Sequence, residues 1–419
     1  MPTSSTFASL NALDPEKTTQ PPLTETTAPQ PVESTPRQRS QWQTTPSETD
    51  APTPTAPHHD HGIPKPFLHL YTTSYLIFFS ILGTLARLGL QSLTFYTGAP
   101  ITTGVLWANV AGSLIMGFLS EDKNLFREEW GTSSPPTPTS DPEHTKKHKA
   151  VKKTIPLYIG LTTGFCGCFT SFSSFMRDVF LALANALPDP SLPTGVNIAS
   201  RNGGYSFMAL LAVIIVTVSL SLSALIFGAH LALALGRFTP TVPFVLTRRV
   251  LDRAVVVLGW GCWLGAVFLA IWPPDRHEER EVWRGRVVFA LVLAPVGCLL
   301  RFYVSLMLNA RIAAFPLGTF VVNMFGTAVE GMCFDLQHVG GLGAEVGSVV
   351  GCQVLQGMMD GFCGSTTTVS TWVSELNGLG NRRHAYVYGI GSVGCGLGLL
   401  VVIMGSLLWT KGFMEPVCN

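Results

Sequence analysis

The feature that most limits how this chain can fold is a series of nine apolar runs, each close to the length that crosses a lipid bilayer. A helix needs about 20 predominantly apolar residues to span the hydrocarbon core. The runs cover 71–95, 102–119, 155–181, 205–235, 254–272, 287–308, 317–336, 347–375 and 385–409. Only 13% of the residues are charged, against roughly 25% in soluble domains. The sequence therefore predicts an all-α integral membrane protein with nine spans.

Two polar stretches interrupt this pattern. Residues 1–66 are rich in Ser, Thr, Pro and Gln and hold almost no large apolar residues, so this tail is predicted to be disordered. It lacks the basic start and apolar core of a secretory signal, and its His58, His59 and His61 are interpreted as part of the polar tail rather than as a metal site. The second stretch, 120–153, predicts a long cytosolic loop. The net charge of +1 offers no basic field for nucleic acid.

The chain contains an internal repeat. A shift of 214 positions places Gly83 on Gly297, Arg87 on Arg301 and Asn109 on Asn323, and it also aligns Gly112 and Gly117 with Gly326 and Gly331. Beyond the polar loop the shift is 197, and GFCGCFTSFSSFMRD (164–178) overlays GFCGSTTTVSTWVSE (361–375). Four spans precede and four follow the run at 254–272, so the two copies enter the membrane from opposite sides. The prediction is two inverted four-helix repeats joined by a single linker transmembrane helix, an arrangement typical of transporters.

This repeat defines the predicted domains. They are the N-terminal tail (1–66), the first repeat (67–236), a linker (237–286) with the inverting helix 254–272, the second repeat (287–410) and a C-terminal tail (411–419). With a cytosolic N-terminus, fourteen Lys and Arg fall in the cytosolic loops between spans and six in the outer segments, so the C-terminus is predicted to lie outside. The nine cysteines show no paired spacing and are interpreted as small buried residues.

Polar residues inside the spans are the candidate functional groups. Arg87 and Arg301 lie in the first span of each repeat, where an arginine is costly. They either snorkel or pair for structural reasons, or they draw anions into an aqueous vestibule. Asn109 and Asn323 lie in the middle of the second spans. Their amides either donate to an anion or hydrogen-bond a neighbouring helix.

The third span of each repeat carries the densest pattern. Gly164, Gly167, Gly361 and Gly364 are expected to weaken or break the helix and to free backbone carbonyls. Where two such helices cross, these carbonyls would suit a small hard cation such as Na+. A hydroxyl-rich run follows in both copies: Thr170, Ser171, Ser173 and Ser174, matched by Thr367, Thr368, Ser370 and Thr371. Phe172 and Phe175 interleave the first run, and the positive edges of two rings can replace part of the hydration shell of an anion.

Taken together, GxxxR in the first helix, GxxxxN with a following xxG in the second and GFxGxxTxFSxF in the third resemble the fluoride channels of the Fluc/CrcB type. The duplicated nine-helix form is similar to the fluoride exporters of fungi and plants. The resemblance covers about residues 70–410. It implies an antiparallel two-fold assembly made from one chain, which exports F− passively across the plasma membrane through one or two narrow pores and so gives fluoride resistance.

The resemblance also implies roles for individual residues. Phe172 and Phe175 match fluoride-facing phenylalanines, and Asn109 and Asn323 match pore asparagines. Ser173, Ser174, Ser370 and Thr371 lie on the polar track. Gly167, Thr170, Gly364 and Thr367 match residues whose carbonyls hold a structural Na+, and Arg87 and Arg301 match vestibule arginines. Asp178 and Glu375 overlay an acidic position of the family.

The second copy departs from this pattern, which leaves open which pore conducts. Val369 and Trp372 stand where the two phenylalanines would be. Glu330 and Asp360 have no acidic counterpart in the first copy, and no role is assigned to them. These two carboxylates are the candidates for coupling in the alternative function, an ion-coupled secondary transporter of another small solute. An enzyme is not expected, because the spans hold no paired His and acid, no GxSxG and no metal-spaced ligands.

Overall fold

The computed structural model describes residues 65–127, 151–192, 201–273, 287–339, 349–416 and Cys418. Within these ranges all regular structure is helical, as the sequence predicts. The first helix, α1 (Lys65–Thr94), begins one residue before the predicted end of the polar tail. The rest of that tail, with its three histidines, and most of the polar loop lie outside the described residues.

Within the described residues, six continuous helical segments are long and apolar enough to cross a membrane. They are Pro66–Thr94 of α1, α7 (Gly203–Ala234), the combined α8, η4 and α9 at Phe244–Ile271, α10 (Phe289–Leu308), α11 (Leu317–His338) and α15 (Arg382–Thr410). The other three predicted spans are also helical in the described residues. One is the shorter α2 (Leu106–Glu121), and the other two are the third spans of the repeats, which are broken.

Both broken spans follow the same order of elements. The first runs through α4 (Pro156–Ile159), η3 (Gly160–Cys166), α5 (Gly167–Phe169) and, after a break, α6 (Phe172–Leu183). The second runs through α12 (Val349–Gly357), η6 (Met358–Cys363), α13 (Gly364–Thr366) and, after its break, α14 (Ser370–Gly378). The segments η3 and η6 are π-helices, a form found frequently at functional sites.

The predicted position of the breaks is wrong by three residues or more. The glycines of both copies lie in helical backbone, and the chain becomes extended at Thr170 (φ −94°, ψ 152°) and at Thr367 (φ −98°, ψ 157°). What the glycines provide is close approach: a Cβ on Gly167 would collide with the guanidinium of Arg301, and one on Gly364 with that of Arg87. The glycines therefore admit the arginines, and other groups end the helix.

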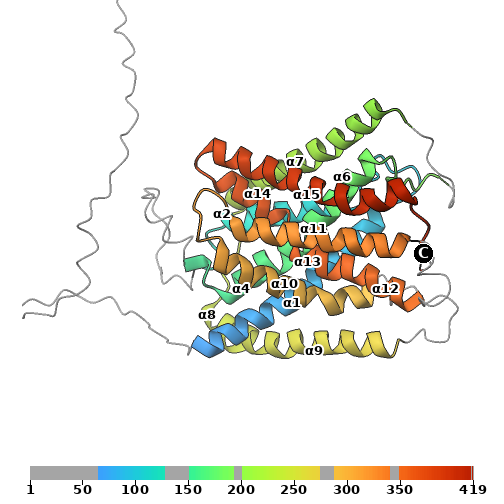
Figure 1. Ribbon diagram of the computed structural model, residues 1–419. Coiled ribbons are helices and arrows are strands. Elements are labelled where there is room, and N and C mark those ends of the chain that lie inside the picture. The colour runs from blue at the N-terminus through green and yellow to red at the C-terminus, as the bar shows by residue number, and fades with distance from the viewer. Residues whose placement is uncertain are drawn as a thin grey trace, which may run out of the picture. The chain divides into compact units, whose positions relative to one another are not determined.

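The linker helix α9 (Asp252–Ile271) packs along α1 and α10, as Figure 1 shows at the edge of the bundle. The Trp260 indole donates to the Ser74 hydroxyl at 3.1 Å, and the Tyr75 hydroxyl donates to Asp252 at 3.0 Å. On its other side α9 exposes Val257, Leu264 and Phe268. Apolar side chains facing outward along a helix are what a lipid environment requires.

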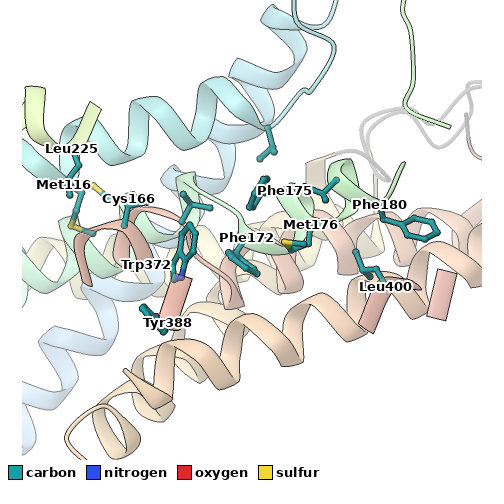
Figure 2. Packing of buried hydrophobic residues seen from close by; sticks show 14 of the residues in the cluster. Met116, Cys166, Phe172, Phe175, Met176, Phe180, Leu225, Trp372, Tyr388 and Leu400 are labelled. Carbon is teal, nitrogen blue, oxygen red and sulfur yellow. The ribbon is translucent and has the colours of Figure 1, made fainter. Parts of the chain in front are cut away.

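The second parts of the two broken spans, α6 and α14, are exchanged between the halves of the chain: each packs mainly against the opposite half, and α6 also packs against α7 of its own half. The first half's α6 packs against α11 and α15 of the second half, while α14 packs against α2 and α7 of the first half. A hydrophobic cluster including Phe172, Phe175, Met176 and Trp372 fills the space between them (Figure 2). This exchange brings the two breaks into direct contact.

One disulfide was missed by the interpretation of all nine cysteines as small buried residues. Cys352, near the start of α12, is bonded to Cys418 near the end of the chain. The residues shortly before Cys418 also pack on α11. The N–H of Met414 donates to the carbonyl of His338 at 3.0 Å, and the Phe413 ring stands edge-on to that of Phe334. The C-terminal segment is thereby tied to the second half of the molecule.

Candidate functional site

The two breaks hold each other in place through their threonine hydroxyls. The N–H groups of Val369 and Ser370, at the start of α14, donate to Thr170 Oγ1 at 3.2 and 3.1 Å. In return, the N–H groups of Phe172 and Ser173 donate to Thr367 Oγ1 at 3.1 and 3.0 Å. Each threonine thus caps the helix that belongs to the other copy, satisfying amides that a helix start leaves without partners.

Asn109 and Asn323 end the first part of each broken span, at the end of α5 and of α13. Asn109 Oδ1 accepts from the N–H of Ser171 at 2.9 Å, and Asn323 Oδ1 accepts from the N–H of Thr368 at 2.9 Å. In an uninterrupted helix these amides would bond the carbonyls of Gly167 and Gly364, four residues earlier. Asn109 also donates from Nδ2 to the carbonyl of Ser171, and Asn323 donates from Nδ2 to the carbonyl of Thr368, both at 3.4 Å. The predicted helix–helix hydrogen bond is therefore formed, and one amide proton on each Nδ2 is left over.

The hydrogen bonds of the two asparagines free backbone carbonyls, which concerns the Na+ site that the sequence resemblance implies. The carbonyls of Gly167 and Gly364 lose their helical donors to the asparagines. Those of Thr170 and Thr367 lose theirs because the N–H groups of Ser174 and Thr371 bond the hydroxyls of Ser171 and Thr368. Four backbone oxygens on two segments in contact are thus available, and such oxygens are ligands for hard cations. The chemistry of these oxygens suits a small cation, and the Na+ site stays a prediction.

The two arginines lie at the same crossing, almost completely buried. Arg301 donates from Nε to the carbonyl of Ser365 at 2.9 Å and from Nη2 to the carbonyl of Thr163 at 2.8 Å, joining the two broken helices. Arg87 donates from Nη2 to the carbonyl of Asp360. The Nη1 atom of each is buried without a partner among the described residues. Their predicted vestibule role stays a prediction; the structure shows cationic groups anchored to backbone carbonyls.

The aromatic residues of the two halves meet at the centre, as Figure 2 shows. The Phe172 and Phe175 rings are fully buried and stand edge-on, with centroids 5.8 Å apart and planes at 82°. Phe172 is also edge-on to Trp372, at 5.4 Å and 70°. Val369 is fully buried too, and the Nε1 of Trp372 has no hydrogen-bond partner among the described residues.

The predicted polar track forms two separate sets of hydroxyls among the described residues, and each set has members from both copies. In the first copy, Ser171 Oγ lies 2.9 Å from Ser174 Oγ and 3.4 Å from Ser173 Oγ. Ser173 Oγ lies 3.0 Å from Thr367 Oγ1, which carries the set across to the second copy. In the second set, Thr368 Oγ1 lies 3.3 Å from Ser370 Oγ, 3.4 Å from Thr371 Oγ1 and 3.2 Å from Thr170 Oγ1 of the first copy. The predicted hydroxyls of each copy therefore lie beside a threonine of the other copy.

Sequence reasoning missed a polar pocket around Glu375. Its carboxylate accepts from Thr319 Oγ1 at 2.7 Å, from Asn309 Nδ2 at 3.2 Å and from the Tyr388 hydroxyl at 2.7 Å. The donors come from three separate elements. The one signal in the sequence was the divergence of the copies at Thr319, whose counterpart is Val105.

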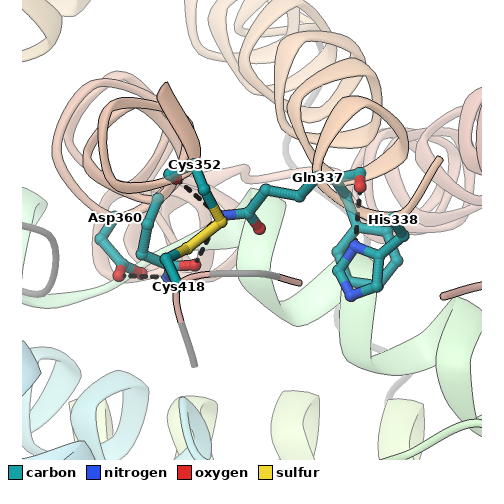
Figure 3. The surroundings of a disulfide bond; sticks show 7 residues. Gln337, His338, Cys352, Asp360 and Cys418 are labelled. Atoms are coloured by element: carbon teal, nitrogen blue, oxygen red, sulfur yellow. Dashed lines mark hydrogen bonds between the residues drawn. A yellow bond between two sulfur atoms is a disulfide. The ribbon is translucent and has the colours of Figure 1, made fainter. Parts of the chain in front are cut away.

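The two carboxylates without an assigned role are both engaged. Glu330 is buried and lies 3.0 Å from Arg177 Nη1. Asp360 Oδ2 accepts from Gln356 Nε2 at 2.6 Å, and Gln356 in turn accepts from Gln337 at 3.3 Å. Gln337 also donates to the carbonyl of Cys352 at 2.9 Å, so a chain of hydrogen bonds joins Asp360 to the neighbourhood of the disulfide (Figure 3).

Comparisons with known proteins show which family the sequence resembles. Residues 74–229 and 288–406 match the model of the family described as CrcB-like protein, Camphor Resistance (CrcB). The chain is 60% identical over 368 residues to Fluoride export protein 1 of Neurospora crassa, covering 83% of this chain and 69% of the relative. It is 36% identical to Fluoride export protein 1 of Candida albicans, over 80% of this chain and 79% of the relative. A 90-residue stretch, 21% of this chain, is 34% identical to 66% of the Fluoride-specific ion channel FluC of Shewanella halifaxensis. No solved structure matches.

Proposed function

Because the chain belongs to the CrcB family, whose model matches both of its halves, we propose that it is a fluoride-selective channel that exports F− passively across the plasma membrane. Relatives named fluoride export protein and fluoride-specific ion channel support the substrate and the mode of transport. Fluoride enters cells as HF and is trapped as the anion in a more neutral cytosol, and the membrane potential then drives it out. Such a protein is a transporter rather than an enzyme.

The observation that carries the proposal is the buried crossing of the two broken helices. Fluoride is small and strongly hydrated, so a narrow path must replace its water with donors at every step. The crossing supplies hydroxyl groups in both copies, the spare amide protons of Asn109 and Asn323, and aromatic edges. A pore lined by neutral donors binds an anion weakly enough to release it.

The residues of the proposed pore follow from this crossing. Asn109 and Asn323 each hold a break and present one amide proton. Phe172 and Phe175 present ring edges. The hydroxyls are those of Ser173, Ser174, Ser370 and Thr371. Arg87 and Arg301, buried at the crossing, add positive charge that attracts anions.

We also propose the inverted architecture for this chain. Residues 67–236 and 287–410 form two antiparallel repeats, connected by the linker at 237–286 with its inverting helix at 254–272, and a single chain supplies both halves of the pore. The matching order of elements and the reciprocal threonine caps support this arrangement. The N-terminus faces the cytosol. The disulfide supports an outer C-terminus, because disulfides persist in oxidising compartments.

A structural Na+ at the crossing belongs to the same proposal. The backbone carbonyls of Gly167, Thr170, Gly364 and Thr367 would hold it. Bound there, the cation would supply positive charge that ties the two extended segments together. The protein's own contribution is to take the competing amides: Asn109 and Asn323 take those that would bond Gly167 and Gly364. The hydroxyls of Ser171 and Thr368 take those that would bond Thr170 and Thr367.

The test is fluoride efflux from liposomes that contain the purified protein, with an ionophore to carry the compensating current. Fast efflux of F− that requires the ionophore, with no efflux of Cl−, is the expected result. Flux that instead depends on a gradient of protons or another ion would contradict the channel. It would favour a coupled transporter of another small solute, for which the buried carboxylates of Glu330 and Asp360 are the groups available.

A further inference from the structure

A line of polar side chains continues from the crossing between two helices of different halves. On α11 it comprises Asn323, Thr327 and Glu330, whose spacing of four and three residues places them on one face. On α6 it comprises Ser173 and Arg177, four residues apart. Its link to the crossing is Thr367 Oγ1, which lies 3.0 Å from both the N and the Oγ of Ser173. We name these five residues of α6 and α11 the α6–α11 stripe.

The stripe ends in an ion pair with one partly exposed member. Arg177 Nη1 lies 3.0 Å from Glu330 Oε1, and the two side chains are 18% and 1% exposed. The arginine side chain is therefore partly exposed, while the glutamate side chain is enclosed. Between this pair and Asn323, the hydroxyl of Thr327 is fully buried and has no partner among the described residues. The stripe thus holds an unused hydroxyl donor and, at its end, a partly exposed cation.

The other half of the molecule carries the same stripe without the ion pair. The repeat places Asn109, Ser113 and Met116 of α2 on the positions of Asn323, Thr327 and Glu330, and it places Ser370 and Ser374 of α14 on those of Ser173 and Arg177. The hydroxyl of Ser113 is buried and without a partner in the described structure, as that of Thr327 is. The stripes agree at the asparagine, at the buried hydroxyl and at the serine. They differ where one has a charged pair and the other has Met116 and Ser374.

We propose that Arg177 binds fluoride at the end of the α6–α11 stripe, with Glu330 as its buried counter-ion, and that this stripe is the conducting path. The inference rests on the proposed function and names the path that this function uses. An anion that leaves the neutral hydroxyls needs charged donors before it regains water, and a guanidinium carries five of them. Glu330 balances the positive charge, which lets an ionised arginine lie within the membrane-spanning part of the chain. The stripe that ends in Met116 and Ser374 offers no such group.

The first experiment compares fluoride efflux from liposomes for the wild-type protein and for Arg177→Gln. Loss of a charge-assisted hydrogen bond should slow efflux about tenfold or more. Arg177→Lys keeps the charge and should be slowed less than Arg177→Gln. Ser374→Gln makes the matching change at the pseudo-equivalent position and should leave efflux unchanged. Equal rates for wild type and a folded Arg177→Gln protein would overturn the proposal.

A double-variant cycle separates anion binding from a structural ion pair. If the pair only holds α6 to α11, Glu330→Gln alone should be as harmful as Arg177→Gln, and the double variant should recover. If Arg177 binds fluoride, Glu330→Gln should conduct at least as fast as wild type, because the guanidinium loses its competitor. The double variant should then stay as slow as Arg177→Gln. Recovery in the double variant would overturn the inference.

The outcome for the wild-type protein keeps the two proposals distinguishable. No ionophore-dependent fluoride efflux from folded wild-type protein would contradict the proposed function itself. Normal wild-type efflux, slow Phe172→Ile efflux and unaltered Arg177→Gln efflux would leave the channel intact and remove Arg177 from its path. Folding of each variant is checked by its elution as a single species and by its thermal unfolding midpoint in detergent.

Discussion

Trp372 stands edge-on to Phe172, with ring centroids 5.4 Å apart and planes at 70°. The repeat would place a second phenylalanine where Trp372 lies, and another where Val369 lies. Both rings are buried at the centre of the molecule, between half-helices exchanged by the two halves. The aromatic centre is therefore built from unequal parts, and the two possible anion paths are chemically different.

Phe172→Ile should slow fluoride efflux about tenfold, which corresponds to about 1.4 kcal/mol, because an aliphatic side chain has no positive edge to turn toward an anion. The substitution keeps a large apolar group, so the protein should still fold. The measurement is the initial rate of efflux from liposomes. Phe227→Ile, on the exposed surface of α7, is the matched control. An unchanged rate in a folded Phe172→Ile protein would remove the ring from the mechanism.

Asn109→Ser and Asn323→Ser should differ at least about fivefold in fluoride efflux, a difference of about 1 kcal/mol. Both asparagines bond the chain at a break with the same 2.9 Å distance. Their structural losses should therefore be similar, and the larger loss of efflux will mark the conducting path. If the α6–α11 stripe conducts, Asn323→Ser will be the slower variant. Equal partial losses would indicate two working pores.

Much of this architecture could be predicted from the sequence, because the apolar runs and the internal repeat are patterns in the order of the residues. The position of the breaks could not be predicted in this way. Glycine is a local signal, but the helix ends where Asn109 of α2 takes the amide of Ser171 and Asn323 of α11 takes that of Thr368. These bonds join residues more than 40 positions apart, and local propensity carries no information about them.

The parts of the site that were missed share this cause. The pocket of Glu375 takes its donors from Asn309, Thr319 and Tyr388, which lie on different elements. The pairing of Cys352 with Cys418 spans 66 positions and follows no spacing rule. By contrast, the asparagines and the hydroxyl residues of the pore were found because the repeat aligns them, and a residue type retained at the same place in two copies of one chain is a signal that a single sequence can provide. The two phenylalanines, which the second copy lacks, were found from their place among these residues and from the resemblance to the family.

Thr170→Val should destabilise the protein by about 2 kcal/mol or more, because the amides of Val369 and Ser370 would lose their buried acceptor. Valine matches threonine in shape, so the change removes the hydroxyl and little else. Thr170→Ser retains the acceptor and should behave almost as wild type. The thermal midpoint in detergent measures the effect. Thr367→Val should have a similar effect through Phe172 and Ser173, and a stable Thr170→Val protein would show that the reciprocal caps are not essential.

The disulfide between Cys352 and Cys418 should be open to reagents added outside the cell, because the proposed orientation places both residues on that side. In intact cells, a membrane-impermeant reductant followed by an impermeant maleimide should label the wild-type protein. The double variant Cys352→Ser/Cys418→Ser should stay unlabelled, since the exposed Cys262 and Cys395 lie in the apolar helices α9 and α15. Labelling only after the cells are permeabilised would reverse the orientation.

Replacing Na+ with a large organic cation during purification should lower the thermal midpoint of the protein and slow fluoride efflux, if the carbonyls of Gly167, Thr170, Gly364 and Thr367 hold the ion. Preferential binding to the folded state stabilises it in proportion to the logarithm of ligand concentration, so the midpoint should rise steadily as Na+ is restored. The guanidinium groups of Arg87 and Arg301 contact Gly364 and Gly167 at the same crossing. An unchanged midpoint across the Na+ series would mean that these two cations already satisfy the crossing, and that this chain does not use the ion.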